Sequence, residues 1–94
     1  MKPTTHFSTL PEGGLRLAVE RFIKHYFDLH GDHDYGSGLY AQVLQEVEIP
    51  LITETLKATK GNQLRAAHIL GLNRNTLRKK IKGLKIELGF LDKS

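Results

Sequence analysis

Side chains of types that can hydrogen-bond to nucleic acid cluster in the last third of this sequence, at intervals that match a helix. Leu77, Ile81 and Leu84 recur every three or four residues, so a helix through this stretch would bury them on one side. The outward positions are polar or basic: Arg74, Asn75, Arg78, Lys79 and Lys82, with Thr76 at the edge. Such side chains bind phosphates and the major-groove edges of guanine and adenine. The pattern predicts a helix that binds nucleic acid.

The residues before this helix predict a helix-turn-helix, in which two short helices cross at a large angle. Helical caps, small contact residues, core leucines and a turn glycine follow in the required order: Asn62, Ala66, Ala67, Leu70, Gly71, Leu72 and Asn73. We therefore expect one helix at 63–70 and a second from 74 to about 84, with Gly83 helping to end it.

The charge of the chain is divided unevenly along its length. Residues 1–56 carry four basic and eight acidic residues, whereas residues 57–94 carry ten basic and two acidic ones. No acid occurs between Lys57 and Ile86. A segment that repels itself this strongly favours a polyanionic partner, although a lysine-rich face that is only solvated is the simpler alternative.

Two more helices are predicted upstream. The first has an apolar stripe at helical spacing: Leu15, Val19, Phe22, Tyr26 and Leu29. The second begins near Ser37 or Leu39, runs to about Thr59 and contains Pro50, which predicts a kink. It has two apolar sides, one with Tyr40, Leu44, Val47 and Leu51, the other with Ile49, Ile52 and Leu56. Two sides need two covering surfaces, which in a chain of 94 residues predicts a homodimer.

These residues resemble the Fis-type DNA-binding domain, which occurs in the nucleoid protein Fis and at the C-terminus of NtrC-class activators. The resemblance is carried by residues 61–67 and 70–81, and by residues 39–52 with the proline of the family's kinked dimerisation helix. It covers residues 15–86 and implies an all-α, four-helix protomer that intertwines with a second copy. The expected organisation is a linker at 1–14, dimerisation helices at 15–59, a helix-turn-helix at 60–86 and a frayed tail at 87–94.

The resemblance also implies which residues make the contacts. DNA contacts fall on Asn62, Asn73, Arg74, Thr76, Arg78 and Lys79, with backbone contacts from Arg65, Lys80 and Lys82. Asn75 joins this set by its outward position. Dimer contacts are expected from Leu15, Val19, Phe22, Tyr26, Val43, Leu44, Val47, Pro50, Leu51 and Ile52. Leu64 departs from Fis, which has a hydroxyl residue there that can reach a phosphate.

Two functions are compatible with the resemblance. Residues 1–14 show no strand pattern for the N-terminal arm of Fis, which favours the DNA-binding domain of an NtrC-class activator of RpoN-type sigma factor promoters in nitrogen regulation. The alternative is a stand-alone, Fis-like protein that bends DNA in the nucleoid. Either function predicts a homodimer on an inverted repeat of double-stranded DNA, in the bacterial cytoplasm.

Other classes have less support in the sequence. A histidine- and aspartate-rich group consists of His25, His30, Asp32, His33 and Asp34, with His6 elsewhere in the sequence. Of these, His30, Asp32, His33 and Asp34 could hold a cation loosely. These types are also ordinary turn formers, so we expect no metal and no cofactor. The sequence contains no motif around a candidate nucleophile, so we do not expect an enzyme. The absence of cysteine excludes disulfides. A protein-interaction module remains an alternative, and RNA binding is disfavoured because the basic segment lacks aromatic residues.

Overall fold

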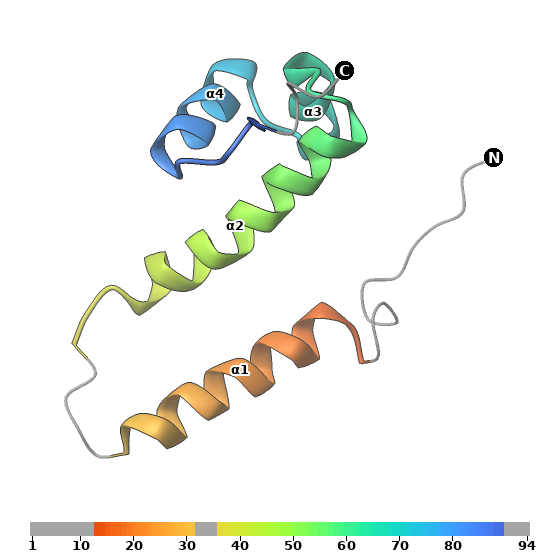
Figure 1. Ribbon diagram of the computed structural model, residues 1–94. Helices are drawn as coiled ribbons and strands as arrows, with labels where there is room; N and C mark the ends of the chain where they lie inside the picture. Colours follow the sequence, from red (N-terminus) through yellow and green to blue (C-terminus); the bar gives the residue numbers. More distant parts are fainter. Residues whose placement is uncertain (1–12, 32–35, 90–94) are drawn as a thin grey trace. The chain divides into compact units, whose positions relative to one another are not determined.

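The computed structural model describes residues 13–31 and 36–89, and every regular element within these ranges is helical (Figure 1). The helices are α1 (Gly14–His30), α2 (Leu39–Ala58), α3 (Gln63–Leu70) and α4 (Arg74–Gly83). The chain divides into two units, one with α1 and the other with α2, α3 and α4. The all-α prediction is confirmed; of the expected linker at 1–14, residues 1–12 lie outside the described residues, and Gly14 is the first residue of α1.

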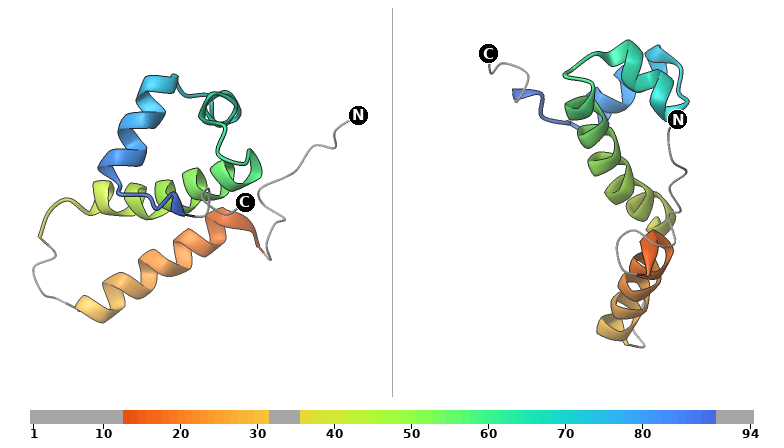
Figure 2. Two further views of the ribbon diagram at one scale, coloured as in Figure 1. Left: turned by 45° about the horizontal axis from the view of Figure 1, so that its top comes forward. Right: turned by 90° about the vertical axis from the view of Figure 1, so that its right-hand side faces the viewer.

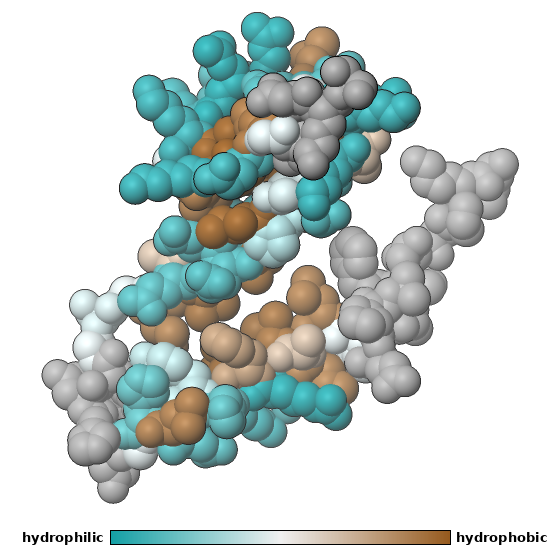
Figure 3. Space-filling view, viewed as in Figure 1, coloured by the Kyte–Doolittle hydropathy of each residue, from teal (hydrophilic) through white to brown (hydrophobic). Residues whose placement is uncertain are grey.

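Helix α1 is amphipathic and leaves much of its apolar surface uncovered. Leu15, Phe22 and Leu29 are 50%, 57% and 69% exposed. Hydrophobic residues gather along one side of this helix and hydrophilic residues along the other (Figure 3). Contiguous exposed apolar surface of this kind is typical of an interaction face.

Helix α2 uses its two apolar sides differently. Ile52 and Leu56 are 1% and 0% exposed, because they pack into the core of their own unit. Tyr40, Leu44 and Leu51, on the other apolar side, are exposed. Ile52, which was expected at the dimer face, is thus already covered by residues of its own unit. The stripe that remains available to a partner is the one that contains Leu51.

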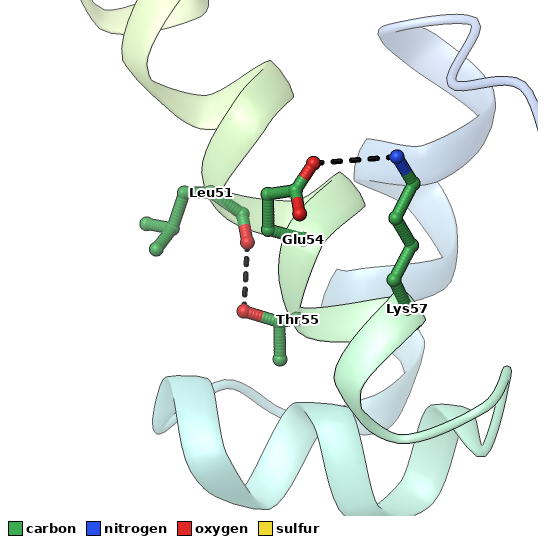
Figure 4. Close-up of polar contacts among 4 residues, drawn as sticks. All are labelled: Leu51, Glu54, Thr55 and Lys57. Atoms are coloured by element: carbon green, nitrogen blue, oxygen red, sulfur yellow. Dashed lines mark hydrogen bonds and ion pairs between the residues drawn. The ribbon is translucent and has the colours of Figure 1, made fainter.

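The second half of α2 remains helical beyond Pro50. Thr55 Oγ1 donates a hydrogen bond to the Leu51 carbonyl at 2.7 Å, and Lys57 pairs with Glu54 at 3.4 Å (Figure 4). Figure 4 also shows the Leu51 side chain pointing to the side of α2 away from α4. Both contacts lie within α2 itself, whereas Ile52 and Leu56 of the same helix pack into the core.

The core of the second unit joins all three of its helices. Its buried members are Ile52, Leu56, Ala66, Ala67, Leu77, Ile81 and Ile86, with Leu70, Leu72, Leu84 and Leu88 packed around them. Helix α3 contacts both α2 and α4. The left view of Figure 2 looks along α3 while α4 runs across the page, so the two cross at a large angle. The predicted helix-turn-helix packing is present, and Leu88 of the tail contributes to it.

All three helices of this unit end in the same hydrogen-bonded motif. Gly61, Leu72 and Ile86 each donate a backbone hydrogen bond to the carbonyl five residues earlier, at 2.8, 2.9 and 3.0 Å. The residue before each is left-handed, namely Lys60 (φ 53°), Gly71 (φ 73°) and Lys85 (φ 54°). This is the Schellman motif, for which glycine is the preferred left-handed residue. The sequence predicted it at Gly71, but the left-handed residue after α4 is Lys85 and not Gly83.

We expect Leu77→Ala to lower the free energy of unfolding by about 2–5 kcal/mol, because it leaves a cavity beneath a fully buried side chain. Leu64→Ala is the matched control, since Leu64 is 63% exposed and its removal should change stability by less than about 0.5 kcal/mol. Denaturant titration at one protein concentration measures both. Equal effects would contradict the assignment of Leu77 to the core.

We expect Lys85→Gly to raise the free energy of unfolding by about 0.5–1 kcal/mol, because glycine adopts a positive φ without the steric cost of a Cβ atom. Lys85→Ala removes the same charge but keeps the strained backbone, so it should give no such gain. Thermal unfolding of the two variants separates the effects. If both variants gain equally, the charge of Lys85 and not its backbone conformation is responsible.

Candidate nucleic-acid interface

Two asparagines fix where the helices of the helix-turn-helix begin. Asn62 accepts a hydrogen bond from the Arg65 N–H at 3.0 Å, and Asn73 accepts one from the Asn75 N–H at 2.8 Å. Each cap uses the side-chain oxygen, so the amide NH₂ of each residue can still donate to another group. The caps therefore place two hydrogen-bond donors at the first turns of α3 and α4. Both asparagines were expected as DNA contacts.

The outer side of α4 is polar and basic, as predicted. Asn75, Arg78, Lys79 and Lys82 line one open hollow along this helix. Leu77 and Ile81 lie on the opposite side, where they anchor α4 in the core. Hydrophilic side chains cover the outside of α4 in Figure 3. Because the anchor residues are buried, the four polar side chains are presented together on a supported helix.

The first turns of α3 and α4 add further exposed side chains. Arg74 and Thr76 are exposed beside the Asn73 cap, and Arg65 is exposed on α3. Leu64 is exposed on the same helix, where it cannot donate a hydrogen bond to a phosphate. No acidic residue belongs to either helix, so this surface has one sign of charge. Such a surface attracts polyanions over the range of the Debye length.

Lys80 differs from the other basic residues of α4. Its Nζ lies 2.7 Å from Glu48 Oε2, and the two side chains are only 35% and 31% exposed. It therefore sits on the flank of α4 next to α2 and not on the outer side. Sequence reasoning missed Glu48 as its partner. The available signal was helical phase, because Lys80 follows Leu77 by three residues and Glu48 precedes Ile52 by four.

Most residues expected in a dimer contact keep accessible surface in the single chain. Leu15, Phe22, Leu44, Pro50 and Leu51 are exposed, and a second group is half-buried: Val19, Tyr26, Val43 and Val47. Ile52 alone of this set is buried in the core of its own unit. The structure therefore leaves apolar stripes on α1 and on α2.

The histidine cluster forms no cation site within the described residues. No three histidine, aspartate or glutamate side chains in that part of the chain lie close enough together to hold a metal ion. His30 Nδ1 is 2.7 Å from the Tyr26 carbonyl, and its ring lies against that of Tyr26 with centroids 4.2 Å apart. The other candidates, His6, Asp32, His33 and Asp34, fall outside the described residues. None of the described helices is long and apolar enough to cross a membrane.

Comparison with known proteins agrees with this geometry. Residues 43–84 match the family described as bacterial regulatory protein, Fis family. The chain is 58% identical over 79 residues to the DNA-binding transcriptional regulator NtrC of Azospirillum brasilense, covering 83% of this chain and 16% of that protein. The corresponding NtrC of Bradyrhizobium sp. (strain RP501 Parasponia) is 52% identical over 81 residues, covering 86% and 17%. The chain thus spans about a sixth of the length of these NtrC relatives.

A second group of relatives is similar to this chain over most of their own length. The DNA-binding protein Fis of Buchnera aphidicola subsp. Schizaphis graminum (strain Sg) is 48% identical over 69 residues, which cover 72% of this chain and 69% of that protein. The family is described as one of bacterial regulatory proteins, and both groups of relatives are named as DNA-binding proteins. Together with the packed helix-turn-helix, these similarities show that the chain belongs to the Fis family of bacterial regulatory proteins.

Proposed function

We propose that this chain binds double-stranded DNA sequence-specifically, with α4 as the reading helix. The observation that carries the proposal is the outer side of α4, where Asn75, Arg78, Lys79 and Lys82 line one hollow on a helix anchored by buried residues. Supported side chains of these types at the spacing of one helical turn suit the major groove. The relatives, the DNA-binding transcriptional regulator NtrC and the DNA-binding protein Fis, support the same function.

The residues divide into two roles by chemistry and position. Arg74, Asn75 and Arg78 lie toward the N-terminal end of α4, where reading helices contact base edges. Arginine donates two hydrogen bonds to guanine, and asparagine pairs with adenine. Lys79 and Lys82 then bind phosphates, which fixes the register of the helix on the duplex. Asn62 and Arg65 extend the phosphate contacts from the start of α3.

The protein acts as a homodimer in this proposal. The exposed stripes of α1 and α2 provide the apolar surface that a second copy would cover, with Phe22 57% and Leu51 51% exposed in the single chain. A two-fold dimer presents two equivalent copies of α4, so its site is an inverted repeat with half-sites about one helical turn apart.

The biological setting that we favour is the DNA-binding region of an NtrC-type activator of RpoN-type sigma factor promoters in nitrogen regulation. The 58% identity to the Azospirillum brasilense regulator supports this choice. A stand-alone, Fis-like protein that bends DNA in the bacterial nucleoid is the second candidate, supported by similarity over 69% of the Buchnera aphidicola protein. The reading frame upstream of residue 1 in the gene distinguishes the two, because an NtrC-type regulator would encode receiver and ATPase domains there.

We expect Arg78→Ala to weaken binding to the matched inverted repeat by about 1–3 kcal/mol and to relax the preference at one base position. Lys79→Ala should weaken all duplexes alike and lower the slope of log affinity against log salt by about one for each phosphate that is no longer neutralised. Two protomers double that change. Titration of the matched and the scrambled duplex at several salt concentrations measures both effects.

The control for these titrations is Arg21→Ala, which removes an exposed arginine from α1. It should leave both affinity and slope unchanged. If Arg78→Ala and Lys79→Ala also leave both unchanged while the fold survives, the basic side of α4 is only solvated and the proposal is wrong.

We expect Leu51→Asp to convert the dimer to a monomer, because a carboxylate would be buried without a partner in the apolar contact. Leu64→Asp is the matched control, since it places the same charge at an exposed leucine of α3 outside the stripe. Sedimentation equilibrium at micromolar concentration measures the mass of each variant. A monomeric wild-type chain, with a melting temperature independent of concentration, would contradict the dimer.

A further inference from the structure

The ion pair between Glu48 and Lys80 connects the reading helix to α2. Lys80 Nζ lies 2.7 Å from Glu48 Oε2, and the two residues are 32 positions apart in the sequence. The pairs Lys24–Glu20 and Lys57–Glu54, in contrast, each lie within a single helix and between exposed side chains. The Glu48–Lys80 contact is therefore a tertiary one, and it joins two helices of the same unit.

Helical phase places this pair at the edge of the core. Glu48 lies one turn before Ile52 on α2, and Lys80 lies one turn after Leu77 on α4. Ile52 and Leu77 are both fully buried. About two thirds of each charged side chain is covered, so water screens the pair less than it screens the surface pairs.

We infer that Lys80 positions α4 on α2 through Glu48 and does not bind a phosphate. This inference rests on the proposed DNA-binding function and refines the expectation that Lys80 is a backbone contact. An ammonium 2.7 Å from a carboxylate already has its counter-charge. Moving it to a phosphate would leave the half-buried carboxylate of Glu48 unpaired, which is costly, and close to a polyanion. Lys79, the residue before Lys80, is exposed on the outer side of α4 and is not held by the Glu48 carboxylate.

Positioning matters here because the hollow on α4 must meet the groove in one orientation. Leu77 and Ile81 hold the helix against the core, but apolar contacts are not directional. A hydrogen-bonded ion pair on one flank restricts rotation of α4 about its own axis, and a functional group must be held to within about 10–20°. The other end of the pair is on α2, which also carries the exposed Leu51 stripe. The pair thus connects the proposed dimer helix to the reading helix.

The test is a set of substitutions in the full chain that remove or exchange the two charges. Lys80→Gln and Glu48→Gln each remove one charge, and a third variant combines them. A fourth exchanges the charges, as Glu48→Lys with Lys80→Glu. Lys79→Gln is the matched control on the adjacent residue. For each, the affinities for a duplex selected by the wild-type chain from a random pool, and for its scrambled version, are measured against salt concentration.

We expect Lys79→Gln to lower the salt slope by about one per protomer, because one phosphate per protomer would no longer be neutralised. Lys80→Gln and Glu48→Gln should instead weaken binding to the selected duplex by about threefold to tenfold with the slope unchanged, and the double variant should be no weaker than either. The exchanged pair should restore affinity for the selected duplex. A thermal-unfolding cycle without DNA should show that the two positions are coupled in the free chain.

Several results would overturn the inference. One is a slope that falls as far for Lys80→Gln as for Lys79→Gln. Another is tighter, more salt-dependent binding by Glu48→Gln, which would mean that Lys80 had been released to a phosphate. The inference would also be overturned if the variant with exchanged charges folds normally but does not regain affinity for the selected duplex. If the wild-type chain shows no salt-dependent binding, the proposed function itself is rejected. The wild-type titration gives this result before any variant is measured.

Discussion

The structure depends on the close approach of α3 to both of its neighbours. Ala66 and Ala67 are 0% and 3% exposed, and only side chains this small let two helices pack tightly against a third. Ile52 and Leu56 contact this cluster from α2, and Leu77 contacts it from α4. A larger residue at either alanine would force these helices apart, with the usual cost of an overpacked core. The presentation of the basic side of α4 follows from that contact, because the buried side of α4 determines which side faces outward.

The same C-terminal hydrogen-bonded motif ends three of the helices and stabilises this arrangement. Each of α2, α3 and α4 is followed by a left-handed residue, and the next residue closes the helix with a backbone hydrogen bond. At Gly71 the conformation has no steric cost, whereas Lys60 and Lys85 adopt it despite their Cβ atoms. Their positive charges lie at helix C-termini, where the macrodipole favours cations and offsets part of that cost. Both lysines also add to the positive charge of the unit.

The basic residues of the helix-turn-helix lie in two different environments. Those on the outer side of α4 are free to meet a partner, while Lys80 is held against α2 by Glu48. Net charge alone does not distinguish them, because charge attracts a polyanion without setting its orientation. In our proposal, the orientation of α4 on a partner comes from the caps, the core and the ion pair. Exposed apolar side chains on α1 and on α2, among them Phe22 and Leu51, provide the surface that the proposed second copy would cover.

The sequence by itself determined the parts of this protein that depend on local order. Helical spacing placed Leu77 and Ile81 inward and Arg78 and Lys79 outward, and short side chains at Asn62 and Asn73 marked where the helices begin. Only the tertiary structure decided which of the two apolar sides of α2 its own chain covers, and hence that Ile52 is core. It also decided that Lys80 pairs with Glu48 and that the left-handed turn after α4 falls on Lys85. The physical reason is that periodicity defines the sides of a helix, whereas the neighbour that covers each side is defined by contacts between residues distant in sequence.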